Sequence, residues 1–260
     1  MNEDAECTLV FVDMLGFAAL TEEFPKRLIH SGPDEHGFEH TSTSLASDQF
    51  WHFNRILESC VFEHRLNGNL RAMLFSDCAF LEVGNSFRAG VVSVELMRKF
   101  VTERVLVRMG IGKGTFYPSQ FSTDSIGSTI VTRSLFVGTA VVRSHYAEKC
   151  GGKGLRIFVH PSVEADFISK RVALVTPYEN AKWELDFLHE SRPAQDRPSA
   201  EEDDRSLFDA VLEMKEMAPA RAQRHYTDTL DAMNRMRQKN SRPHVVEVVH
   251  NQEVIDERHE

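Results

Sequence analysis

The stretch Thr8-Leu-Val-Phe-Val-Asp13-Met-Leu-Gly16-Phe17-Ala-Ala-Leu-Thr21 decides the fold. It opens with an apolar run rich in Val and Phe, which predicts a buried β-strand. The run ends at Asp13, and Gly16 then turns the chain into a segment with helical character. A carboxylate at the end of a buried strand needs a partner. Asp13 is therefore expected either at the solvated rim of a sheet or against a cation.

The same arrangement recurs at Asp77, 64 positions along the chain (77 − 13). Two apolar strands, predicted over 70–75 and 79–83, are joined there in a tight hairpin. In an α+β, ferredoxin-like fold of order β-α-β-β-α-β, the first strand and this hairpin can be neighbours. Both carboxylates would then reach one point. The spacing alone equally allows two strand-end aspartates that cap adjacent turns.

The remaining periodicity supplies the other elements of this core. Helices are predicted over 17–28, 47–65 and 86–102, strands over 105–111, 156–160 and 171–175, a glycine turn over 110–114, an extended arm or hairpin over 115–133, and a loop entering a helix over 136–149. Residues 29–45 are polar and predict a loop. We expect a main domain over 1–190, an acidic linker over 191–205, and a C-terminal helical extension with a tail over 206–260.

Composition limits the function. The 260 residues are 42% hydrophobic and 27% charged, which is ordinary for a soluble globular protein. The formal net charge of −9 argues against binding to nucleic acid or to an anionic membrane. The acidic N-terminus lacks the basic start of a signal peptide, and the four cysteines form no C-x-x-C pair. We therefore expect a cytoplasmic protein.

Two carboxylates at one rim are hard oxygen ligands that suit Mg²⁺ or Mn²⁺ carried in with a nucleoside triphosphate. Such ions bridge phosphate oxygens and stabilise the attacking and leaving groups. The turn at Gly16 would present backbone N–H groups at a helix start, which is a seat for phosphate.

Four segments resemble motifs of the class III nucleotidyl cyclases, in the right order and spacing. The resemblance covers residues 8–175. The segments are Phe11-Val-Asp13-Met-Leu-Gly16-Phe17, Phe75-Ser-Asp77, Arg108-Met-Gly-Ile-Gly-Lys-Gly114 and Phe136-Val-Gly138-Thr-Ala-Val-Val-Arg143-Ser-His-Tyr-Ala-Glu148.

The resemblance implies that residues 1–190 are a cyclase catalytic domain. Asp13 and Asp77 would hold the two metal ions, with the backbone carbonyl of Met14 as a further ligand. The backbone from Leu15 through Gly16 to Phe17 would seat the β- and γ-phosphates. Because the family places its active sites between two catalytic domains, this chain would work as a homodimer.

Several positions depart from the family. The two residues that select a purine base align with Met73 and Leu135, and neither can hydrogen-bond a purine edge. An unpaired buried base edge costs about 1–3 kcal/mol. The transition-state Asn and Arg of the family align with Val142 and Tyr146. Three nearby cations are the candidates to replace the lost charge. They are Arg143, which is our preferred catalytic residue, Lys113, which we also expect to contact nucleotide, and Arg133.

This pattern is similar to the bacterial Pycsar anti-phage pyrimidine cyclases, which make cyclic UMP or cyclic CMP to activate a separate effector. The resemblance implies a pyrimidine triphosphate as substrate, with UTP preferred over CTP. Two alternatives stay open. One is an adenylate or guanylate cyclase with an atypical base pocket, and the other is a degenerate cyclase domain that acts as a dimerisation or nucleotide-sensing module. Two retained aspartates oppose the second, because paired carboxylates repel one another without a cation.

Overall fold

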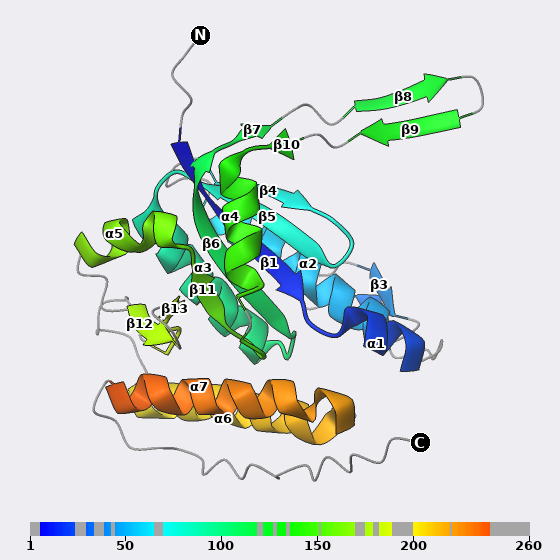
Figure 1. Cartoon of the computed structure of the whole chain (residues 1–260). Coiled ribbons are helices and arrows are strands. Elements are labelled where there is room, and N and C mark those ends of the chain that lie inside the picture. The colour runs from blue at the N-terminus through cyan, green and yellow to red at the C-terminus, as the bar shows by residue number, and fades with distance from the viewer. Residues whose placement is uncertain are drawn as a thin grey trace, which may run out of the picture.

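The computed structural model describes residues 6–23, 30–33, 39–42, 45–64, 70–118, 122–126, 129–133, 136–150, 152–169, 175–178, 182–188, 200–218 and 220–239. Its centre is a seven-stranded sheet of order β12-β13-β11-β6-β1-β5-β4 (Figure 1). Its strands are β1 (Glu6–Met14), β4 (Leu70–Leu74), β5 (Cys78–Val83), β6 (Val107–Thr115), β11 (Ile157–Val159), β12 (Val175–Tyr178) and β13 (Lys182–Leu185). Within the described part of the chain, no helix is long and apolar enough to cross a membrane.

Seven helices accompany the sheet in the described residues. They are α1 (Phe17–Glu23), α2 (Leu45–His64), α3 (Ser86–Thr102), α4 (Thr139–Glu148), α5 (Pro161–Ser169), α6 (Ala200–Met217) and α7 (Gln223–Lys239), with a 3-10 turn at Ala220–Ala222. Three small two-stranded sheets pair β2 (His30–Pro33) with β3 (Glu39–Ser42), β7 (Tyr117–Pro118) with β10 (Phe136–Val137), and β8 (Ser122–Ile126) with β9 (Thr129–Arg133).

The four strands β6-β1-β5-β4 confirm the ferredoxin-like prediction. β1 pairs antiparallel with β5 on one side and with β6 on the other, and β5 pairs antiparallel with β4. The helices α2 and α3 make the two crossovers of the β-α-β-β-α-β order. β11 then extends the sheet by pairing parallel to β6. β1 therefore lies inside the sheet, paired on both edges, as its apolar composition requires.

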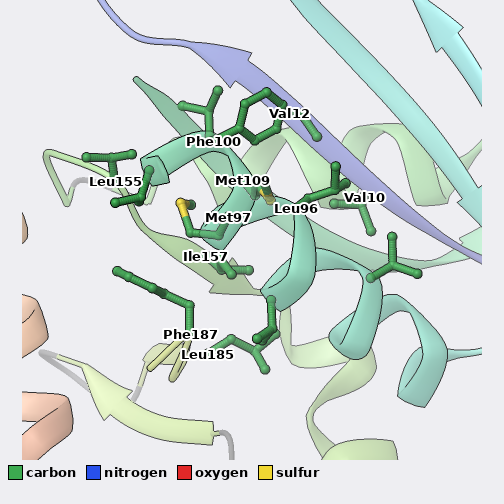
Figure 2. Packing of buried hydrophobic residues seen from close by; sticks show 14 of the residues in the cluster. Val10, Val12, Leu96, Met97, Phe100, Met109, Leu155, Ile157, Leu185 and Phe187 are labelled. Atoms are coloured by element: carbon green, nitrogen blue, oxygen red, sulfur yellow. The ribbon is translucent and has the colours of Figure 1, made fainter. Parts of the chain in front are cut away.

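Side-chain alternation divides β1 between two cores. Val10, Val12 and Met14 join the larger cluster, in which α3 packs against the sheet (Figure 2). Leu9 and Phe11 face the other side and join a smaller cluster covered by α4. Because successive side chains of a strand point to opposite faces, Asp13 lies on the α4 side.

The C-terminal helices pack on the core as a pair (Figure 1). Phe208 on α6 and Met233 on α7 are fully buried in the larger cluster. A buried ion pair joins Arg237 near the end of α7 to Asp204 near the start of α6, so the two helices run antiparallel.

Three sequence expectations need correction. Residues 29–45 were expected as a loop, but their described part contains a β-hairpin, β2–β3. Residues 200–205, expected as linker, are helical, since acidic residues favour the N-terminal turns of a helix. Residues 110–114 are the middle of β6 and not a turn.

The glycines of β6 allow a close approach of α4. A Cβ added to Gly110 would lie 2.1 Å from the backbone oxygen of Ser144, and one added to Gly112 would lie 2.5 Å from the Ser144 nitrogen. On Gly114 the Cβ would meet the Thr139 hydroxyl at 2.2 Å. Helix α4 therefore rests directly on the strand backbone. Glycines at every second position of a strand leave one of its faces without side chains. The turn prediction was wrong because it did not consider this alternation.

This packing is testable with Gly110→Ala. The added methyl group overpacks the α4–β6 contact, and we expect the free energy of unfolding to fall by about 2–3 kcal/mol or more. The control is Gly84→Ala, since a Cβ at Gly84 has no heavy atom within 4 Å, and it should change stability by less than about 0.5 kcal/mol. Urea unfolding of both variants measures the difference, and equal stability would contradict direct packing of α4 on β6.

Candidate functional site

Asp13 and Asp77 lie side by side at one rim of the sheet. Asp13 pairs in register with Cys78, the residue after Asp77. The backbone N–H of Met14 donates to the backbone oxygen of Asp77 at 2.8 Å. The Ser76 hydroxyl donates to the Asp77 carboxylate at 2.8 Å. The end of β1 and the β4–β5 turn are thus fastened together, and this fastening brings the two carboxylates to one place.

Arg108 lies on the same face as Asp13, directly across the β1–β6 ladder. Its Nε donates to the Glu148 carboxylate at 2.5 Å, and its Nη1 donates to the Gly152 carbonyl at 2.9 Å. Glu148 ends α4 and is fully buried. Its second carboxylate oxygen, Oε2, is buried without a hydrogen-bond partner among the described residues. The rim therefore carries three carboxylates and one guanidinium.

This environment disfavours charge on Asp13. Partial burial, helped by the charges of Glu148 and Asp77 against the opposing effect of Arg108, raises the pKa of Asp13 from 3.8 to about 6. A carboxylate that is costly to ionise beside other carboxylates is stabilised by an added cation.

The donor set fits a divalent cation. Asp13 and Asp77 supply carboxylate oxygens. The Met14 side chain is buried in the larger core, so its backbone carbonyl is the part of this residue that would bind a cation. No cluster of three or more His, Cys, Asp or Glu side chains suited to a metal occurs elsewhere in the described residues or here. Glu148 is engaged by Arg108. Two carboxylates with a backbone carbonyl leave room for phosphate oxygens and water, which Mg²⁺ retains when it binds.

The expected phosphate seat is smaller than the sequence suggested. The N–H of Leu15 already donates to the Leu106 carbonyl at 2.9 Å, so it is unavailable to a phosphate. Gly16 is exposed with φ of +73°, a conformation that glycine adopts without strain, and Phe17 begins α1. Only the Gly16 and Phe17 part of the predicted seat remains.

Met73, an expected base contact, is 3% exposed and packs in the smaller core cluster with Phe80. Phe80 in turn contacts Phe11, Phe75 and Phe136, with ring centroids 4.7–6.3 Å apart. The wall on this side of β4 and β5 is therefore apolar and aromatic. The other expected base contact, Leu135, lies outside the described residues.

Within one chain, Lys113 and Arg143 lie apart from Asp13. Lys113 lies five positions along β6 from Arg108. Because side chains alternate between the two faces of a strand, Lys113 points to the face opposite Arg108. There its Nζ contacts Asp166 at 3.3 Å and Glu6 at 3.5 Å. Arg143 packs against β6 and donates from Nη1 to the Lys113 carbonyl at 2.7 Å. The third candidate, Arg133, ends β9.

Val142 and Tyr146 occupy the solvent face of α4, one turn apart, and are 52% and 65% exposed. Arg143, at the neighbouring position, is half-buried on the side toward β6. Arg143 and Tyr146 therefore point in different directions. On its solvent face α4 presents two large apolar side chains.

Sequence reasoning gave no role to Arg108 or Glu148, although both belong to the quoted motifs. The signal was present for Arg108, because a charged residue within an apolar strand requires a partner. Glu148 lies 40 positions away. Its pairing depends on how α4 crosses the sheet, which sequence periodicity does not specify.

Comparison with known proteins gives two negative results and one group of similar folds. No protein-family model and no curated protein match the chain. Cyclase domains are similar in structure. The guanylate cyclase domain of RhGC from Catenaria anguillulae, in complex with GTP, is 14% identical, with a TM-score of 0.49 over 71% of this chain and 96% of that one.

Two further structures extend this group. The guanylyl cyclase domain of the RhoGC fusion protein from Blastocladiella emersonii is 14% identical, with a TM-score of 0.46 over 70% of this chain and 94% of that one. A bacterial light-regulated adenylyl cyclase is 14% identical, with a TM-score of 0.41 over 78% of this chain and 98% of that one. These TM-scores are below 0.5, so the fold is assigned from the strand order described above and not from these similarities.

The raised pKa predicts how stability depends on pH when no divalent cation is present. An unfolded Asp13 ionises near pH 3.8, whereas the folded one ionises near pH 6. Between these pH values Asp13 binds fewer protons in the unfolded chain than in the folded chain. The free energy of unfolding therefore falls as the pH rises. Asp13→Asn removes this effect, and in EDTA the variant should be more stable than wild type by about 1–2 kcal/mol at pH 8, with a smaller difference near pH 5.

Urea unfolding in EDTA at pH 5 and pH 8 measures this difference. The exposed Asp209→Asn serves as control, and its stability relative to wild type should be the same at both pH values. Added Mn²⁺ should stabilise the wild type and not Asp13→Asn. A wild type that is more stable than Asp13→Asn at pH 8 in EDTA would contradict the assigned environment.

Proposed function

We propose that this chain is a metal-dependent nucleotidyl cyclase that converts a nucleoside triphosphate to a 3′,5′-cyclic monophosphate and pyrophosphate. The observation that carries the proposal is the meeting of Asp13 and Asp77 at the rim of a ferredoxin-like sheet, beside Arg108. The order of the four cyclase-like motifs supports the same reaction. In this reaction the O3′–phosphorus bond forms, the bond between the α-phosphorus and the bridging oxygen breaks, and the hydroxyl proton is lost to solvent.

Each residue at the rim would have a separate role in this reaction. Asp13, Asp77 and the Met14 carbonyl would hold Mg²⁺ or Mn²⁺, which when bound lowers the pKa of the 3′-hydroxyl and offsets triphosphate charge. Gly16 and Phe17 offer backbone N–H groups toward the β- and γ-phosphates. Arg108 contributes a fixed positive charge next to Asp13, held by Glu148 and Gly152. A cation oriented before the reaction stabilises developing negative charge at little reorganisation cost.

We further propose that the substrate is a pyrimidine triphosphate, with UTP preferred over CTP. The support is the apolar wall at Met73, together with the Leu135 side chain in the sequence, because neither offers a hydrogen bond to a purine edge. The sequence resemblance to the Pycsar cyclases adds a cyclic UMP or cyclic CMP signal, read by a separate effector in defence against phage. A cytoplasmic location accords with this role.

Incubation with each of the four triphosphates and Mn²⁺, followed by identification of the product by mass spectrometry, tests the proposal. We expect turnover of UTP, or else of CTP, to exceed that of ATP and GTP. Asp13→Ala and Asp77→Ala should each lower turnover by about 100-fold or more, since each removes a metal ligand. Faster turnover of a purine would exclude the pyrimidine assignment. Absence of turnover with all four would favour a nucleotide-sensing module.

Homodimerisation is proposed through the exposed face of α4. Val142 and Tyr146 leave a large apolar surface there, and Val137 and Tyr117, which pair across β7 and β10, are 64% and 46% exposed. Apolar surface of this kind is a frequent sign of an interface. A second copy seated on α4 would cover these four residues and complete a site shared between two chains.

The change Tyr146→Asp tests this interface. A charge in an apolar interface core is strongly disfavoured, so sedimentation velocity should show monomer and turnover should fall at least about tenfold. Met217→Asp is the matched control, because Met217 is 70% exposed on α6. It should leave both the oligomeric state and turnover unchanged. A dimer that survives Tyr146→Asp would place the interface elsewhere.

A further inference from the structure

The C-terminal helix α7 has a specific connection to the candidate site. It reaches the chain segment 152–155, which leads from the end of α4 into β11. The Thr229 hydroxyl of α7 accepts from the Leu155 N–H at 2.9 Å and donates to the His225 carbonyl at 2.7 Å. Both hydrogen-bonding functions of this buried hydroxyl are therefore used. The hydroxyl donates within α7, and its oxygen holds segment 152–155 through the Leu155 N–H.

A second contact lies one residue away. The Gly154 N–H donates to the Nδ1 of His225 at 3.4 Å. Burial, together with the nearby charges of Lys153 and Arg108, lowers the pKa of His225, which favours the neutral ring able to accept at Nδ1. Gly154 has φ of +85°, and a Cβ there would lie 2.3 Å from the Thr229 hydroxyl. The segment is thus pressed against α7 at a position that requires glycine.

The other end of the same segment holds Arg108. The Gly152 carbonyl accepts from Arg108 Nη1 at 2.9 Å. Gly152 is itself wedged in place, because a Cβ there would lie 2.3 Å from the ring of Phe158. Gly152 and Leu155 are three residues apart, so a shift at the α7 end moves the carbonyl that orients Arg108.

Helix α7 is a firm base for this segment. Arg237 on α7 forms a buried ion pair with Asp204 on α6, and Arg235 lies 3.9 Å from Glu184 on β13. Breaking a buried pair of this kind is costly, so α7 is held at its far end. The contacts from Thr229 and His225 therefore hold segment 152–155 at a fixed position.

We propose that Thr229 is a positioning residue: through segment 152–155, helix α7 sets the place of the Arg108 guanidinium beside Asp13. The C-terminal extension is then part of the site's framework and not an independent appendage. The consequence for turnover rests on the proposed cyclase function, while the placement of Arg108 does not.

Three variants of one helix separate this role from simple stability. Thr229→Val keeps the branched shape and removes the hydroxyl. Thr229→Ser keeps the hydroxyl. Thr227→Val is the matched control, because Thr227 makes the same kind of bond within α7, to the Gln223 carbonyl at 3.1 Å. Thermal unfolding of each variant shows that the chain is folded under the conditions used.

The readout for placement is the Nε–H signal of Arg108 in ¹⁵N-arginine-labelled protein, assigned by its loss in Arg108→Lys. In the wild type this proton is bonded to Glu148 and should exchange slowly with solvent. We expect Thr229→Val to shift the signal and to speed its exchange about tenfold, with Thr229→Ser close to wild type and Thr227→Val unchanged. An unchanged Arg108 signal in Thr229→Val would overturn the proposal.

Turnover supplies the second readout. In an active wild type, Thr229→Val should lower kcat about tenfold with KM nearly unchanged, because a misplaced guanidinium loses transition-state stabilisation. Thr229→Ser should restore most of the rate. A moved signal with unchanged kcat would overturn the expected effect of this placement on turnover. A wild type without turnover would refute the cyclase function alone, and the Arg108 signal would still decide whether α7 places that residue.

Discussion

The structure depends on how closely α4 approaches β6. Three alternate glycines leave one face of the strand without side chains, and α4 packs on the exposed backbone. This contact fixes where α4 ends and so places Glu148 over Arg108. Since Arg108 lies across from Asp13, the helix packing determines the electrostatics of the rim. The raised pKa of Asp13 is thus a consequence of backbone packing as well as of burial.

The larger core supports this arrangement from the other face. Helix α3 packs under β1, β6 and β11 with fully buried side chains such as Leu96, Met97 and Phe100. β1 is paired on both edges and packed on both faces, so its end has little freedom. A metal-binding carboxylate benefits from this rigidity, because the geometry that a small divalent cation demands does not tolerate large displacements.

Much of this could be predicted from the sequence. The strand pattern and the tight hairpin were sufficient to predict that Asp13 and Asp77 meet. Both features are local in sequence, and the prediction needed only one long-range pairing, that of β1 with β5. The partner of Arg108 could not be predicted in the same way, since Glu148 reaches it only through the path of α4. The path of residues 110–114 was misjudged for a related reason. A run of alternating glycines resembles a turn in composition, and only the facing helix reveals that it is a strand with one bare side.

The positions of the strands in the sheet bear on how this protein can change over time. The residues that would hold metal lie on or beside β1, which is enclosed by β5 and β6. Met73 lies on β4, the outermost strand at its end of the sheet. Mutations on an outer strand disturb fewer neighbours than those on an enclosed one. Substitutions at Met73 and elsewhere on β4 can therefore accumulate while the enclosed strand β1 stays the same.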